Sequence, residues 1–176
     1  MSTSPLEIQN PLIVSEALEI AEDKTGNFFK FSFEQWKRHR YEVKILSSLK
    51  PIEIIPDAFA LLRKGSRVVS GFESKTKRRD FYFIYLQDTQ ILKALKRDKN
   101  LDVLPLLVYV FTHELVHIVR FCNFLQRFEL AEKERIKEEK IVHSTTSDIL
   151  KGISLPKLDY VLEVYRDHGI CEWGCA

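Results

Sequence analysis

Apolar positions in the first fifty residues recur at the spacing of a helix. Residues 11–21 place leucine and alanine on one face, which predicts a first helix that ends at Gly26. Ser32 begins a second helical pattern and has Gln35 three residues later, the arrangement of a capping box. Aromatic and aliphatic residues then continue at helical spacing until Pro51, which cannot continue a helix. We therefore expect two helices in this part of the chain.

The pattern changes in the next part of the chain. Alanine and leucine after Pro56 predict a short helix that ends at Gly65. Residues 67–72 and 80–86 are instead rich in β-branched and aromatic side chains, which favours strands. The basic segment 74–79 between them is typical of a solvent-exposed turn. The two strands are therefore predicted to form an antiparallel hairpin.

Helical periodicity returns after the hairpin. Residues 88–96 predict a short helix, and a strongly apolar helix follows the polar residues that end at Asp102. The pattern stays helical and becomes highly charged from Phe121 to Ile149, until Gly152 breaks it. The whole pattern predicts an α+β fold that is mainly helical, with a small antiparallel sheet beside the apolar helix.

The chain has the length of one domain. Its 176 residues include 45% hydrophobic residues and 12 phenylalanines, enough apolar material for one core. No internal repeat or low-complexity linker divides the sequence. We therefore expect a single metal-binding domain over residues 1–176, with mobile ends at 1–10 and 170–176.

Charge and hydropathy exclude two classes of partner. Basic residues number 27 and acidic residues 25, and a net charge of +2 gives no indication of nucleic acid or an anionic membrane as the main partner. The N-terminus has no basic stretch followed by an apolar segment, so no secretory signal is expected. The most apolar window, 103–119, contains Pro105, two histidines and a glutamate, which indicates a buried helix rather than a membrane span. A soluble, cytoplasmic protein is the resulting prediction.

The cysteine pattern does not indicate a disulfide-stabilised protein. The chain has three cysteines, and this odd number argues against a disulfide framework. Cys171 and Cys175 lie close together near the C-terminus, with His168 upstream. Such a pair is a weak metal signal, and we interpret it as part of a mobile tail with reducible thiols.

The strongest chemical signal is the sequence His113-Glu114-Leu115-Val116-His117 on the apolar helix. Residues four apart on an α-helix lie on one face, so His113 and His117 could bind the same ion. Zinc is coordinated by neutral imidazole nitrogens and prefers four ligands. Burying two histidines and a glutamate costs several kcal/mol unless they are paired or bind a metal. The alternative is a pair of core histidines satisfied by hydrogen bonds.

On these five residues the chain resembles the zincin metallopeptidases, whose signature is His-Glu-x-x-His. The resemblance implies one zinc per chain, with His113 and His117 as ligands. It also implies that Glu114 is the general base for a metal-bound water. The predicted strand at 81–86 is similar in position to the sheet strand that lies beside the zincin motif helix, by analogy of fold.

The resemblance leaves the third ligand to be found. In metzincins a histidine lies six residues beyond the second motif histidine, but Asn123 occupies that position here. In thermolysin-like zincins the third ligand is a glutamate on a later helix. Glu139 and His143 share a stripe with aliphatic residues on the charged helix. We take His143 as the first candidate, with Glu139 as the alternative ligand or as the hydrogen-bond partner of His143.

This assignment requires a reversal of the chain. A continuous helix from His117 to His143 would separate them by 26 residues, or about 39 Å. The two side chains could then not share an ion. We therefore expect the chain to turn back between Phe121 and Arg135, although neither glycine nor proline lies there.

These observations favour a zinc-dependent hydrolase, most simply a metallopeptidase acting on a peptide or protein substrate. Two alternatives are non-proteolytic. A helical di-iron carboxylate protein would use Glu114 and His117 as a Glu-x-x-His pair, but Lys140 stands where the second such pair needs its glutamate. The second alternative is a structural metal site in a partner-binding domain.

Overall fold

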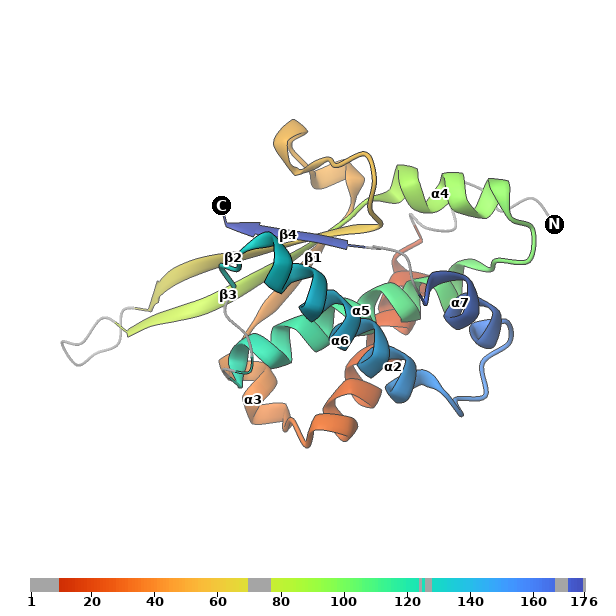
Figure 1. Ribbon diagram of the computed structural model, residues 1–176. Coiled ribbons are helices and arrows are strands. Elements are labelled where there is room, and N and C mark those ends of the chain that lie inside the picture. The colour runs from red at the N-terminus through yellow and green to blue at the C-terminus, as the bar shows by residue number, and fades with distance from the viewer. Residues whose placement is uncertain (1–9, 70–76, 124, 126–127, 167–170, 176) are drawn as a thin grey trace.

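A computed structural model describes residues 10–69, 77–123, 125, 128–166 and 171–175 (Figure 1). The fold consists of a twisted sheet at one side and helices packed around one apolar helix at the other. The predicted α+β class, mainly helical with a small sheet, is therefore confirmed.

The sheet has four strands in the order β1-β3-β2-β4. The long strands β2 (Ala60–Val69) and β3 (Lys77–Leu86) pair in an antiparallel arrangement, with Ala60 opposite Leu86. The predicted hairpin is therefore confirmed. Residues 74–76 of its predicted basic turn lie outside the described residues, and residues 77–79 belong to β3 rather than to the turn. The short strands β1 (Tyr41–Lys44) and β4 (Cys171–Cys175) add in parallel at the two edges. The sheet is thus mixed rather than a simple hairpin.

The helix α5 (Val103–Cys122) forms the centre of the hydrophobic core. It is apolar all round, and α2, α6 and α7 pack against it. By length and composition it is the one candidate membrane span among the described residues, but 89% of its most apolar window is buried inside the protein. This burial supports the interpretation of α5 as a core helix.

The helix α2 (Pro11–Phe29) is longer than predicted. Asn10 caps it by accepting a hydrogen bond from the Leu12 amide, and Ala17 and Ala21 let it lie close to α5. Gly26 does not end this helix. A side chain at Gly26 would come within 3.2 Å of the Phe31 carbonyl oxygen and 3.3 Å of the Trp36 ring, so glycine serves close packing there.

The long helix predicted after Ser32 is wrong beyond its first turns. The capping box of Ser32 and Gln35 is present, but α3 spans only Phe33–Arg38. The chain then forms β1 and two short 3₁₀ turns, Leu46–Ser48 and Pro51–Glu53. Apolar residues alternate with charged ones from Tyr41 onward, and pairing with β3 favours the strand conformation that this alternation permits.

The short helix predicted after Pro56 is also wrong. Ala60, Leu61 and Leu62 instead begin β2, which is paired on both sides by β3 and β4. These three side chains are buried. A central strand that is covered on both faces reads as a continuous apolar run, so its sequence does not distinguish it from a buried helix.

Two of the remaining helices follow the predicted pattern: α4 spans Asp88–Arg97 and α6 spans Glu132–Leu150. The last helix, α7 (Leu158–Tyr165), was not predicted from the sequence. The C-terminal segment differs from the expectation of a mobile tail, because residues 171–175 pair with Ala60–Lys64 as β4. This edge of β2 offers unpaired backbone groups, which any extended segment can satisfy. The predicted mobile residues 1–9 and His168 lie outside the described residues.

Candidate metal centre

The helix α5 places the two motif histidines on one buried face. His113 and His117 are one helical turn apart and have no exposed surface. Their Nε2 atoms lie 3.2 Å from each other. Two bare imidazole nitrogens at this distance repel, so a proton or another cation is needed between them.

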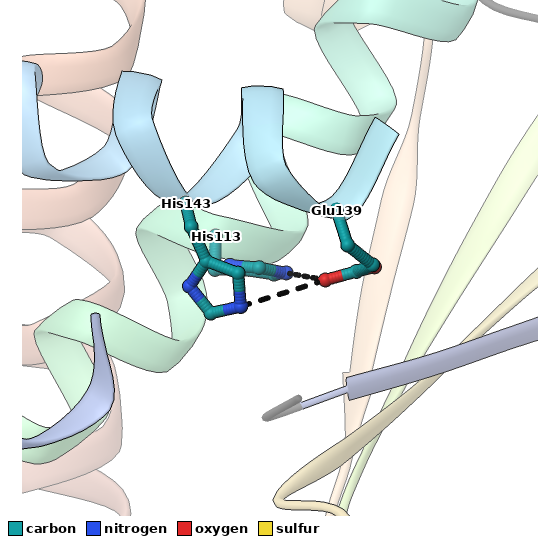
Figure 2. A group of neighbouring side chains, drawn as sticks. All are labelled: His113, Glu139 and His143. Carbon is teal, nitrogen blue, oxygen red and sulfur yellow. Dashed lines mark ion pairs between the residues drawn. The ribbon is translucent and has the colours of Figure 1, made fainter. Parts of the chain in front are cut away.

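The helix α6 brings Glu139 and His143 to the same place (Figure 2). α5 ends at Cys122 and α6 begins at Glu132, so the chain reverses within the segment where the sequence analysis required it. Glu139 and His143 are one turn apart on the face of α6 that meets α5. The four residues that were predicted as possible ligands are therefore brought together.

The carboxylate of Glu139 bridges the two motif histidines. Its Oε1 lies 3.1 Å from His117 Nε2, and its Oε2 lies 3.3 Å from His113 Nε2. Zinc ligands at about 2.0–2.1 Å in a tetrahedron are about 3.3 Å from one another. The contacts that the two oxygens of Glu139 make with the two histidines are close to this edge length. His113, Glu139 and His143 also have possible ligand atoms within 4.8 Å of one another, so the cluster could hold a metal ion. The Nε2 of His143 is farther from Glu139 Oε2, at 3.6 Å.

Two groups of the cluster have shifted pKa values. Burial lowers the pKa of His113, and the negative charge of Glu139 only partly offsets this effect. Burial alone would raise the pKa of Glu139, but its contacts with His113 and His117 outweigh burial and hold that pKa below its ordinary value. Glu139 is therefore a carboxylate at neutral pH, the form in which it can bind a metal.

A tyrosine on α5 orients His143. The hydroxyl of Tyr109 lies 2.8 Å from His143 Nδ1 and donates a hydrogen bond to the Tyr165 carbonyl oxygen at 3.2 Å. Because the hydroxyl hydrogen is used on Tyr165, the hydroxyl oxygen accepts from the Nδ1–H of His143. The Nε2 of His143 is then a lone-pair atom directed at the cluster, as second-sphere contacts of metal ligands generally arrange.

Replacement of Tyr109 by phenylalanine tests this orientation. If His143 is a ligand, zinc affinity should fall about 10-fold to 100-fold, the usual cost of losing a hydrogen bond that orients a ligand. If His143 only lies beside the ion, the affinity should stay unchanged. A competition titration with a chromophoric chelator measures the affinity. Tyr160→Phe is the matched control, because Tyr160 donates to Asp98 outside the cluster. Equal affinities for both variants would show that His143 does not bind the ion.

An aromatic stack connects the sheet to His117. The Tyr82 ring of β3 stacks on Phe121, with centroids 6.0 Å apart, and Phe121 stacks on His117 at the same separation. Tyr82 is 1% exposed and Phe121 6% exposed, so this stack is part of the core. The imidazole plane of His117 is therefore fixed by the packing of α5 against the sheet.

A buried ion pair fixes α6 against α5. The Arg120 guanidinium contacts both carboxylate oxygens of Glu138, with Nη2 donating to Oε2 at 3.0 Å and Nε donating to Oε1. The two side chains are 14% and 8% exposed. Arg120 lies three residues after His117, and Glu138 directly precedes Glu139. This two-point contact therefore sets the position from which Glu139 reaches the histidines.

Removal of one partner of this pair should be costly. Arg120→Met leaves the Glu138 carboxylate buried without its partner, and we expect a loss of about 3–5 kcal/mol in the free energy of unfolding. The double variant Arg120→Met/Glu138→Met should lose less, since no charge is left buried. Urea unfolding measures both. Lys151→Met serves as control, because its pair with Asp148 is exposed and should contribute little.

Glu114 is completely buried next to His113. A buried carboxylate in an apolar helix is expensive, and a cation in the neighbouring cluster would lower that cost. The structure therefore keeps the predicted general base within the same buried region as the predicted ligands.

The cluster reaches solvent on one side. A pocket of about 600 Å³ runs along α6, and Glu139 and His143 line its middle. His113 and His117 are fully buried, whereas the Glu139 side chain is 21% exposed. A small molecule could thus reach the cluster from the side on which Glu139 and His143 lie.

Three residues that support the cluster were not predicted from the sequence: Tyr109, Arg120 and Glu138. Tyr109 lies four residues before His113, and Arg120 lies three after His117, so both fall on the motif face of the helix. This spacing could have identified them, but the partner of each residue is on another element and is fixed only by the tertiary structure.

Comparisons with known proteins give no relative for this chain. No family model, no curated protein and no solved structure matches it. The function must therefore be argued from the geometry of the cluster.

Proposed function

We propose that the protein binds one zinc ion through His113, His117 and Glu139 and is a zinc-dependent hydrolase, most simply a peptidase. The observation that carries this proposal is the spacing of their donor atoms, 3.1 to 3.3 Å, which is that of a tetrahedral zinc site. In this proposal Glu139, rather than His143, is the third protein ligand. Two motif histidines and a later glutamate are also the ligand set implied by the resemblance to thermolysin-like zincins. A cytoplasmic location is part of the same proposal.

The chain would supply the remaining groups of the reaction. Zinc, when bound, polarises a carbonyl group and makes a water more acidic. Glu114 accepts the proton of that water and later transfers it to the leaving nitrogen. His143, which contacts Tyr109 and lines the pocket along α6, would lie next to the bound ion.

A structural zinc site is the second candidate function. The specific observation in its favour is the direction of His143, whose Nε2 faces the cluster and would close it as a fourth protein ligand. A closed site stabilises the fold and leaves no position for water. His143→Ala distinguishes the candidates: the hydrolase keeps its zinc, whereas the structural site loses affinity.

The first test is elemental analysis of protein purified without added metal. We expect about one zinc per chain, and chelation should lower the thermal midpoint of unfolding. Two irons per chain would support the di-iron alternative. A folded protein that neither contains nor takes up a metal would refute the proposal and leave a hydrogen-bonded histidine cluster in the core.

A further inference from the structure

Glu114 and the two motif histidines are closed off from solvent. All three side chains have no exposed surface. The pocket along α6 reaches Glu139 and His143, but none of the three buried residues is among its described lining residues. The proposed hydrolase needs water and a substrate beside both the metal and the general base. The structure is therefore the closed state of such an enzyme, and part of the protein must move before hydrolysis.

The segment that follows α7 contributes to the wall of this pocket. Arg166 lines the pocket, and the other described lining residues all belong to α6. The preceding residue, Tyr165, accepts a hydrogen bond at its carbonyl oxygen from Tyr109, whose hydroxyl also contacts His143. The rings of Tyr165 and Tyr109 have centroids 6.3 Å apart. The end of α7 thus packs against a residue that contacts the cluster.

The strand β4 connects the end of α7 to the sheet. It begins at Cys171, five residues after Arg166, and pairs with Ala60–Lys64 of β2. Phe59 directly precedes β2, and its ring centroid lies 5.3 Å from that of Tyr165. The end of α7 is therefore joined to the start of β2 in two ways, by this ring contact and by the pairing of β4.

Among the elements around the cluster, β4 is the one that can be released at the lowest cost. α6 carries Glu139 and His143, so its departure would remove a proposed ligand. α2 packs closely on α5 through the buried Ala17 and Ala21, and β2 is also paired with β3. β4 has five residues and is an edge strand that pairs in parallel with β2. Short elements of this kind open locally well below the free energy of global unfolding.

We propose that β4 is an autoinhibitory strand. While β4 pairs with β2, the end of α7 stays against Tyr109 and the cluster is closed. Release of β4 lets Tyr165 and Arg166 move away, which opens the cluster to water and substrate. This inference rests on the proposed function, because it describes the regulation of that site.

The accessibility of the motif histidines tests this inference without metal or catalysis. Diethyl pyrocarbonate modifies accessible imidazoles, and mass spectrometry measures the rate at each histidine. In the metal-free protein, a chain that ends at residue 170 should react at His113 and His117 at least about 10-fold faster than the full chain, because no local opening is needed. His39 lies outside the cluster and is the internal control, with equal rates expected in both proteins. Equal rates at the motif histidines would overturn the inference.

A second variant keeps the length of the chain. Glu172→Pro/Trp173→Pro removes two successive amide hydrogens of β4, and one of them points toward β2 because successive amides point to opposite edges of a strand. The reaction at the motif histidines should accelerate as in the shortened chain. Glu172→Val/Trp173→Val is the matched control, because valine favours a strand. Equal acceleration in both double variants would attribute the closure to the two side chains and overturn the inference.

Hydrogen exchange tests the release of β4 in the unchanged protein. The amides of β4 should exchange at least about 10-fold faster than the amides of β3 that pair with β2, because β4 opens by itself. Equal protection of the two strands would show that β4 opens only together with the sheet, which contradicts an autoinhibitory strand.

Peptide hydrolysis separates this inference from the proposed function. The zinc-loaded chain that ends at residue 170 should have a kcat/KM at least about 10-fold higher than that of the full chain. Exposed histidines without cleavage by either protein would refute the hydrolase but keep β4 as the element that closes the cluster. Equal cleavage by both proteins, with equally protected histidines, would overturn the inference but keep the hydrolase.

Discussion

His117→Ala is expected to purify with fewer than about 0.1 zinc ions per chain, against about one for the unchanged protein. His117 Nε2 contacts both His113 Nε2 and Glu139 Oε1, so its loss removes two of the three ligand–ligand contacts that fit zinc. Two remaining ligands do not hold zinc against dilution or a weak chelator. Elemental analysis after gel filtration measures the ratio of metal to protein.

The control for this experiment is His39→Ala. His39 follows α3 and is not part of the cluster, so it should leave the zinc content unchanged. Glu139→Gln should behave like His117→Ala, because an amide is a poor substitute for a carboxylate ligand. Full zinc content in His117→Ala would show that the ion, if bound, is held by other residues.

Glu114→Gln should reduce hydrolysis by roughly 10²-fold to 10⁴-fold while zinc remains bound. Glutamine keeps the size of the side chain but cannot accept the proton of a water. The measurements are the cleavage rate of a peptide substrate and the zinc content of the same sample. Glu134→Gln is the control, because Glu134 is exposed in the first turn of α6.

The two measurements together separate a catalytic role from a structural one. Loss of both activity and zinc would place Glu114 in the support of the metal site. Retention of both would mean that another group accepts the proton. Only the loss of activity alone fits Glu114 as the general base.

The sequence predicted the elements in which local pattern and tertiary environment agree. α5 carries apolar residues on every side, and α6 has acidic residues in its first turn and a helical stripe, so each is helical for local reasons that packing reinforces. The chain reversal between them was deduced from the length of a continuous helix, because His117 and His143 could not otherwise share an ion.

The sequence did not predict the edges of the sheet. Tyr41–Lys44 and Cys171–Cys175 become strands because β3 and β2 offer unpaired backbone groups. This cause lies elsewhere in the chain, and the propensity of a four-residue or five-residue segment is too small to reveal it. The same applies to the Arg120–Glu138 pair, since a charge pattern along one helix does not identify a partner on another.

The prediction of which residue is the third ligand was limited in a similar way. The stripe on α6 identified both Glu139 and His143, but periodicity gives only the face of a helix on which a residue lies. The distance from each side chain to the motif histidines depends on how far α6 is shifted along α5. That shift is set by contacts such as the one between Arg120 and Glu138.

The position of the cluster between α5 and α6 has a consequence for the unfolded chain. An ion held by His117 and Glu139 joins residues 22 positions apart, so it closes a loop in the same way as a disulfide bond. For a covalent link of this span, the entropy removed from the unfolded state corresponds to about 3 kcal/mol. The ion would thus act as a removable cross-link. Its release would remove one of the links between α5 and α6 and leave the Arg120–Glu138 pair to join them.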